Sequence, residues 1–138
     1  MKRQTLRALA AIAASFLAPI FVPDASARTI HVPGDYPQIQ AAIDAAADGD
    51  TVYVHNSAEP YHEDVFVSGK SIVVRGESQL GVAIDGAITA EIQMWQEVSL
   101  EEMKVFGGVA VRGGRGGAVL RRLRIEKTLG VTNAGGSP

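Results

Sequence analysis

Hydrophobic and polar positions change period twice in the first half of the chain. Ile30 and Val32 alternate with polar neighbours, which predicts a short strand that a Pro-Gly pair ends. Apolar residues then recur at helical spacing, which predicts a helix with one apolar face (Ile39, Ala42, Ile43 and Ala46). Alternation returns in "TVYVHN" and in "DVFVSGKSIVVRGE", which predicts strands of four or five β-branched residues separated by a glycine turn.

The predicted helix carries signals for both of its ends. Asp35 is placed as its N-cap, Gln38 lies three residues on as in a capping box, and Pro37 suits the first turn. Gly49 is placed to end the helix. Ten helical residues would span roughly 15 Å.

The second half contains an internal repeat of 20 residues. Leu100, Met103, Val105 and Val111 recur as Leu120, Leu123, Ile125 and Val131. Glycine-rich bends lie behind each strand, and a fixed period built of short strands and bends is typical of a solenoid. A leucine-rich repeat is excluded because its asparagine consensus and helix signal are absent.

We therefore predict a parallel β-helix, with about three strands in each turn of chain and coils stacked ~4.8 Å apart. From Thr51 to the end of the chain there is room for about four coils, roughly 19 Å in height. The helix would cover the unpaired backbone and apolar side chains of the first coil, where an open edge invites pairing with other chains. An ordinary helix on the flank of an α+β domain is the alternative.

The first 27 residues have the three-part pattern of a secretory signal peptide. A basic start precedes an apolar run over Ala8–Val22, and Ala25–Ala27 supplies small residues for cleavage. The run is short for a membrane span, which needs ~20 residues, so an uncleaved anchor is the weaker reading. We expect an extracellular, cell-surface or periplasmic protein that has no membrane contact after cleavage.

Cleavage after Ala27 would leave 111 residues with ten basic and fourteen acidic side chains and no cysteine. That length suits one domain, with the strand and capping helix over 28–50 and the coils over 51–138. The net negative charge gives no argument for nucleic acid as a partner. Without disulfides, the stability must come from packing and backbone pairing.

The segment from Thr29 to Gly86 resembles the N-terminal part of right-handed parallel β-helix proteins of the pectin-lyase-like superfamily. The matching pattern consists of "DYPQIQAAIDAA", "GDTV", a Tyr and a Glu before the next strand, "KSIVVRGE" and "AIDG". The resemblance implies a right-handed coil and export more firmly than a reaction, since the family holds pectinesterases, polysaccharide lyases, uronan epimerases and secreted repeat proteins. The chain has no segment like the "G-x-x-D-F-I-F-G" motif of pectinesterases, so a truncated or unusually short relative is expected.

Enzymes of this fold use acids, a basic residue and sometimes Ca²⁺, which makes a few charged residues candidates for chemistry. The candidates are the acids Glu63, Asp64 and Asp85 and the basic residues Arg75 and Arg112. They form no recognisable constellation, and we expect Glu63 to serve the turn before its strand and Asp85 the bend before Gly86. Catalytic and substrate-binding residues therefore stay unassigned, and no resident cofactor is expected, with Ca²⁺ as the alternative.

The remaining candidates are histidines, a glycine run and a tryptophan. His31, His55 and His62 have spacings that match no ligand motif, so we expect surface histidines and no metal site. The run Gly113–Gly117 lacks the Lys-Ser/Thr of a phosphate-binding loop and is interpreted as a bend. We expect Trp95, next to Met94, to be a half-buried wedge between coils, with stacking on sugar rings as the alternative.

Three hypotheses for the function follow. The first is an exported, non-catalytic β-helix module that contacts polysaccharide. The second is the N-terminal fragment of a carbohydrate-active enzyme, inactive as it stands. The third is a structural or adhesion protein whose stack associates end to end at its open C-terminal end.

Overall fold

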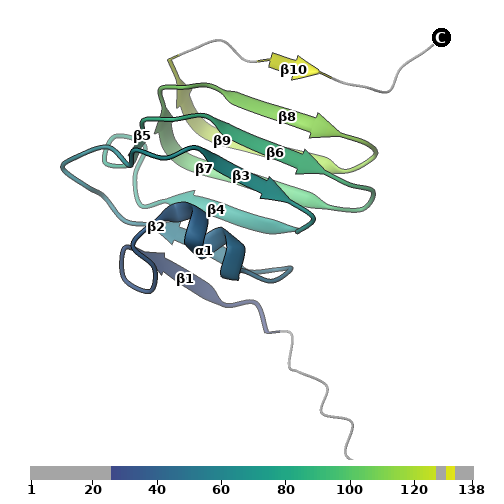
Figure 1. The fold of residues 1–138 in the computed structure, drawn as a ribbon, viewed down its shortest axis with the longest axis horizontal. Coiled ribbons are helices and arrows are strands. Elements are labelled where there is room, and N and C mark those ends of the chain that lie inside the picture. The colour runs from purple at the N-terminus through teal and green to yellow at the C-terminus, as the bar shows by residue number, and fades with distance from the viewer. Residues whose placement is uncertain (1–25, 127–129, 133–138) are drawn as a thin grey trace, which may run out of the picture.

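The computed structural model describes residues 26–126 and 130–132, in which all strand pairing is parallel. The elements are β1 (Thr29–Val32), α1 (Ile39–Ala45), β2 (Thr51–Val54), β3 (Val65–Ser68), β4 (Ile72–Gly76), β5 (Ala83–Ile84), β6 (Ile88–Ile92), β7 (Glu97–Val105), β8 (Val109–Gly113), β9 (Gly117–Ile125) and β10 (Gly130–Thr132). The first sheet has the order β1-β2-β4-β7-β9, and the second has the order β3-β6-β8-β10. Figure 1 shows the second sheet in front of the first, with the chain passing from one to the other in successive coils.

Each coil also contributes to a short third wall. The first part of β7 pairs with β4, whereas its second part pairs with β5. Between the two parts, Glu102 has a φ of 55°, and Arg122 has a φ of 49° at the same point of β9. Both strands therefore turn a corner there, and the isolated bridge from Tyr61 to Ile84 continues this wall. The result is the predicted β-solenoid of about four coils, and the hand of the coil stays a prediction.

The predicted repeat of 20 residues is one coil of this solenoid. Leu100 is the register partner of Leu120, Met103 of Leu123, Val105 of Ile125 and Val111 of Val131. Inside the coils, apolar residues stack in columns; Val52, Val74 and Leu100 form one column, and each is at most 1% exposed. These columns of β-branched and leucine side chains form the core.

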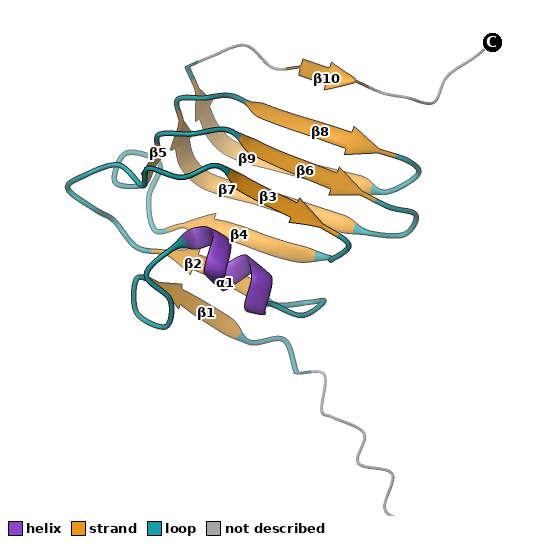
Figure 2. Ribbon diagram, viewed as in Figure 1, coloured by secondary structure: helices purple, strands orange, loops and turns teal. Residues whose placement is uncertain are grey.

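The helix α1 lies beside β3, at the first edge of the second sheet (Figure 2). The four residues of its predicted apolar face are all buried. The side-chain amide of Gln40 accepts a bond from the N–H of Phe66 (2.7 Å) and donates one to the carbonyl of Phe66 (3.1 Å). Gln40 therefore pairs with β3 as a neighbouring strand would, and the interpretation of the helix as a cover for the first coil is confirmed.

The predicted helix ends are wrong. Asp35 accepts a bond from the N–H of His31 instead, and the N-cap is Gln38, which makes no side-chain capping bond. The helix has seven residues and ends at Ala45, well before Gly49, which has a φ of 89° in the turn into β2. The sequence neighbours do not cap the helix because side chains of the next coil do so, as described below.

Residues 1–25 lie outside the described part of the chain, as do 127–129 and 133–138. The predicted signal peptide and its export role therefore stay predictions. Within the described ranges, no helix is both long enough and apolar enough to cross a membrane.

Candidate functional site

The three candidate acids are all engaged by neighbouring parts of the fold. Glu63 accepts bonds from the N–H groups of Ile39 and Gln40, both at 2.9 Å, so it caps the start of α1 rather than a turn. Asp64 accepts a bond from the N–H of Ala87 (2.8 Å). Asp85 lies 2.9 Å from the imidazole of His62, and both side chains are exposed.

Lys70 holds the other end of the same helix. Its ammonium donates to the carbonyls of Ile43, Asp44 and Ala46 at 2.7–2.8 Å. Glu63 and Lys70 lie on either side of β3. The negative carboxylate therefore faces the N–H groups at the start of α1, and the positive ammonium faces the carbonyl groups at its end.

The two candidate arginines lie on different sheets. Arg75 belongs to β4 of the first sheet and Arg112 to β8 of the second, and both are exposed. The five charged candidates do not converge, so no acid–base pair of the kind that glycan cleavage requires is assembled among them.

Two of the three histidines meet, which their spacing in the sequence did not predict. His31 Nδ1 lies 3.1 Å from His55 Nε2, the two rings stack, and Tyr53 stands edge-on to both. His62 is apart from them, bound to Asp85. In residues 26–126 and 130–132, no group of three or more His, Cys, Asp or Glu side chains is placed to hold a metal ion, and the alternative of a Ca²⁺ site stays a prediction.

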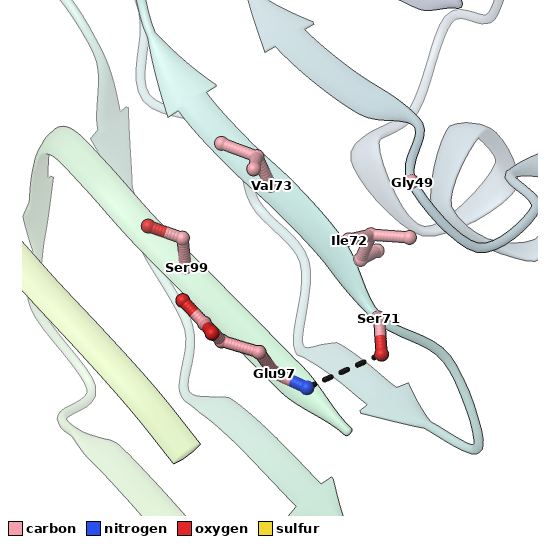
Figure 3. A pocket seen from close by; sticks show the side chains of 6 residues that line it. All are labelled: Gly49, Ser71, Ile72, Val73, Glu97 and Ser99. Carbon is pink, nitrogen blue, oxygen red and sulfur yellow. Dashed lines mark hydrogen bonds between the residues drawn. The ribbon is translucent and has the colours of Figure 1, made fainter. Parts of the chain in front are cut away.

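A shallow pocket of about 200 Å³ opens on the outer face of the first sheet, where β4 and β7 begin (Figure 3). Figure 3 shows Val73 and Ser99, which are register partners, side by side on neighbouring strands. Ser71 Oγ accepts a bond from the N–H of Glu97 (3.2 Å), which ties the two strand starts together. Gly49 and Ile72 complete the lining.

Hydrogen bonds between the turn before β2 and the start of β4 hold the lining residues Gly49 and Ser71 in place. The N–H of Gly49 donates to the carbonyl of Ser71 (2.7 Å), and the N–H of Ser71 donates to Asp48 (2.8 Å). Asp50, which follows Gly49, is buried. Its carboxylate accepts bonds from the backbone N–H and the guanidinium of Arg28 and from the backbone N–H of Ala47. Burial alone would raise the pKa of Asp50, but these bonds and the Arg28 charge outweigh it and hold the pKa below its ordinary value.

Trp95 lies on the turn between β6 and β7. Its side chain is 89% exposed, and that of Met94 is 61% exposed, so the interpretation of Trp95 as a half-buried wedge is wrong. The turn is closed without the indole, because the N–H of Gln96 donates to the carbonyl of Gln93 and the N–H of Gln93 donates to the Gln96 side chain. Trp95 is two residues from Glu97, which places its backbone within about 7 Å of the pocket wall.

Trp95 is held in a backbone conformation that bulky residues rarely adopt. Its φ of 67° lies in the left-handed region, where a non-glycine residue pays a strain cost of order 1 kcal/mol or more. Such strain persists where the surrounding structure fixes it, so the backbone of this turn is held in place by the bonds of Gln93 and Gln96.

The glycine run is the bend that the sequence predicted. The N–H of Gly114 donates to the carbonyl of Ile92, and that of Gly117 to the carbonyl of Gln96, so this bend stacks on the Trp95 turn. A Cβ on Gly113 or Gly116 would overlap Ile92, which explains the glycines. The bend borders a second hollow of about 260 Å³, beside Leu120 of β9, which is 40% exposed.

Among the described residues, β9 pairs on one side only. The predicted association of copies at this end stays a prediction.

Comparison with protein-family models, with curated proteins and with solved structures finds no match to this chain. The parallel β-solenoid is shown by the structure itself. Membership of the pectin-lyase-like superfamily stays a resemblance.

Proposed function

We propose that the protein is an exported β-solenoid module that binds polysaccharide and does not cleave it. The observation that carries the proposal is Trp95, whose side chain is 89% exposed on a closed turn, two residues before Glu97 of the shallow pocket. Export is supported by the signal-peptide pattern of residues 1–27.

The chemistry of this corner suits a sugar ring. A pyranose has an apolar face that packs against an aromatic ring, and its hydroxyls need hydrogen-bond partners at the edge of that contact. Trp95 offers the ring, while Ser71 and Glu97 offer partners from the neighbouring strand starts. A rigid aromatic side chain also loses little conformational entropy on binding, which favours affinity.

The proposal that the module does not cleave its ligand is supported by the bonds that the candidate acids make within the fold. Glu63 and Asp64 are bound to backbone N–H groups of other segments, so neither is free to hold a proton for a substrate. Asp85 is paired with His62. An enzyme built on this chain would need acids from elsewhere, and no observation in the described residues favours that alternative.

Binding can be tested on the purified protein with a panel of soluble polysaccharides, by affinity electrophoresis. We expect retardation by at least one of them, weakened about two- to twelve-fold in Trp95→Ala, since an aromatic stacking contact is worth roughly 0.5–1.5 kcal/mol beyond the area that it buries. Leu80→Ala is the matched control, because Leu80 is 83% exposed on another loop and its removal should change nothing. Equal retardation of both variants, or retardation by no polysaccharide, would refute the proposal.

A further inference from the structure

We infer that Asp50 is the receptor for the amino terminus that cleavage after Ala27 would create. The inference rests on the export part of the proposed function, since a chain cut there begins at Arg28. It goes beyond that function because it assigns a step of maturation to the fold: the new terminus would form an ion pair that holds the first strand to the turn before β2. The bonds of Arg28 carry the argument.

Arg28 is bound at four points to the segment between α1 and β2. Its backbone N–H donates to Asp50 Oδ1 and its Nε to Asp50 Oδ2, both at 3.0 Å. Its Nη2 donates to the carbonyl of Ala45 (2.8 Å), and its own carbonyl accepts from the N–H of Thr51 (2.9 Å). Ala27, by contrast, is exposed. The peptide bond between Ala27 and Arg28 therefore joins an exposed residue to one that is bound into the fold.

The carboxylate of Asp50 is buried and ionised. Its side chain is 4% exposed, and Oδ2 also accepts a bond from the N–H of Ala47 (2.9 Å). Burial alone would raise its pKa, but these bonds and the Arg28 charge hold the pKa below its ordinary value, so the group is negative at neutral pH. Among the described residues, Oδ1 accepts only the N–H of Arg28, which leaves this oxygen a lone pair for a further proton.

Cleavage changes the chemistry of the nitrogen that faces Oδ1. Hydrolysis breaks the C–N bond between Ala27 and Arg28; water gives its hydroxyl to the Ala27 carbonyl carbon and its hydrogen to the Arg28 nitrogen. The new amine takes up a proton from solvent, because an α-amino group has an ordinary pKa of about 7.7–8.0. An uncharged N–H 3.0 Å from the carboxylate thus becomes an ammonium in the same place. Asp50 does not have to move to receive it.

The surrounding charges decide how far the pKa of this amine would shift. The guanidinium of Arg28 and the ammonium of Lys70 are like charges that lower it, but the former is on a side chain 60% exposed to water and the latter is bonded to three carbonyls of α1. Asp35 and Tyr36 line a surface hollow with Arg28, and Asp48 accepts a bond at the start of β4, so these neighbours are negative or neutral at pH 7. A carboxylate at bonding distance raises such a pKa by roughly 1–3. We expect about one unit, a tenfold gain in proton affinity.

The test begins with the full chain, expressed with its leader in a bacterial host that exports it. The intact mass of the exported protein gives its first residue. The pKa of its amino terminus is then measured from the pH dependence of acetylation by acetic anhydride, in buffer and in about 8 M urea, where the unfolded chain is the reference. The matched control has one asparagine inserted between Ala27 and Arg28, so that cleavage after Ala27 leaves the charged terminus one residue away from Asp50.

We expect the pKa in buffer to exceed that in urea by about one unit in the exported protein and by much less in the control. Asp50→Asn should remove the difference, whereas Asp48→Asn should keep it. The insertion leaves Asp50 intact, so it remains informative if Asp50→Asn does not fold.

Stability gives a second readout. A group whose pKa is raised by folding stabilises the fold below its ordinary pKa, and this stabilisation is lost as the pH rises through the folded-state pKa. At pH 7 the urea midpoint of the exported protein should therefore exceed that of the inserted control by about 0.7 M, and the gap should close by about pH 10.

A terminus at Arg28 that titrates as the control does, or a midpoint gap that is the same at pH 7 and pH 10, would overturn the inference and leave the proposed function standing. An exported protein that begins at another residue would overturn it in the same way. Failure of the chain to be exported would count against the inference and against the export part of the proposed function.

Discussion

Removal of the Glu63 carboxylate should weaken the attachment of the capping helix. Both oxygens of Glu63 accept bonds at 2.9 Å from N–H groups in the first turn of α1. The N-cap residue of that helix, Gln38, supplies no side-chain bond, so no protein group replaces the lost acceptors. The first turn of a helix depends on such acceptors because its N–H groups have no partner within the helix.

The size of the effect follows from these two bonds. Loss of a capping side chain costs about 0.5–2 kcal/mol, and bonds to charged groups lie at the upper end of net hydrogen-bond energies. Because Glu63 is half-buried, we expect about 2 kcal/mol for Glu63→Ala and about half of that for Glu63→Gln, which keeps one acceptor oxygen. A domain of this size has roughly 5–15 kcal/mol of stability, so the loss is a substantial part of it.

Urea denaturation followed by circular dichroism measures this loss. With a slope of about 2 kcal/mol per molar urea, the midpoint of Glu63→Ala should fall by about 1 M. Glu59→Gln removes an exposed carboxylate of the preceding loop and should leave the midpoint unchanged. A midpoint of Glu63→Ala within 0.2 M of that control, a threshold of about 0.4 kcal/mol, would refute the reasoning.

Three further predictions concern the same framework. Gln40→Ala should lower the free energy of unfolding by about 1–2 kcal/mol and promote aggregation, because the backbone N–H and carbonyl of Phe66 lose their partners at the edge of β3. Urea midpoints and light scattering measure the two effects, and Gln38→Ala is the control. The folded-state pKa of Asp50 lies below the ordinary value of 3.8, so the ionised carboxylate stabilises the fold above pH 3.8 and this stabilisation is lost as the pH falls through the folded-state pKa. Urea midpoints measured between pH 7 and pH 3 should therefore fall less steeply in Asp50→Asn than in the unaltered protein. Gly76→Ala should cost about 1–3 kcal/mol because its Cβ would overlap the carbonyl of Glu102, whereas Gly114→Ala, which has open space, should cost little in the same assay.

The period of the solenoid could be predicted because apolar residues of the last coils recur at a constant interval of 20 residues. Leu100 and Leu120 face the same core, and a coil without insertions returns each residue to the same column. The first coils are longer, with Val52, Val74 and Leu100 in one column at unequal intervals, so no simple repeat was visible there. Alternation of β-branched residues predicted those strands instead.

The ends of the helix could not be predicted from its own sequence. Asp35 and Gly49 are good local capping residues, but Glu63 and Lys70 cap the helix from the next coil. Those partners are 23 to 27 residues away from the groups that they cap, and only the fold brings them together. The sequence did contain one indication of these contacts. Gln40, Glu63 and Lys70 all belong to the pattern that resembles the pectin-lyase-like superfamily, and all three bond α1 to the neighbouring coil.

The candidate site was predicted least well. His31 and His55 meet because their separation of 24 residues is close to one coil of 22, an interval that the register of β1 and β2 reveals. Trp95 is exposed because hydrogen bonds of Gln93 and Gln96 close its turn, which a hydrophobicity pattern cannot show. Pattern analysis identifies residues that face a core far better than residues that face a ligand.

The central claim is that successive coils stack in register along one axis. Thr29, Val73 and Val119 lie in one outward-facing column, two and four strand spacings apart, although 44 and 90 residues separate them in sequence. Spin labels on the cysteine pairs 29/73 and 29/119 measure this directly by electron paramagnetic resonance, in a chain that has no other cysteine. The account predicts backbone separations of about 10 Å and about 19 Å, and a 29/119 separation well above 30 Å, or one no longer than that of 29/73, would contradict it.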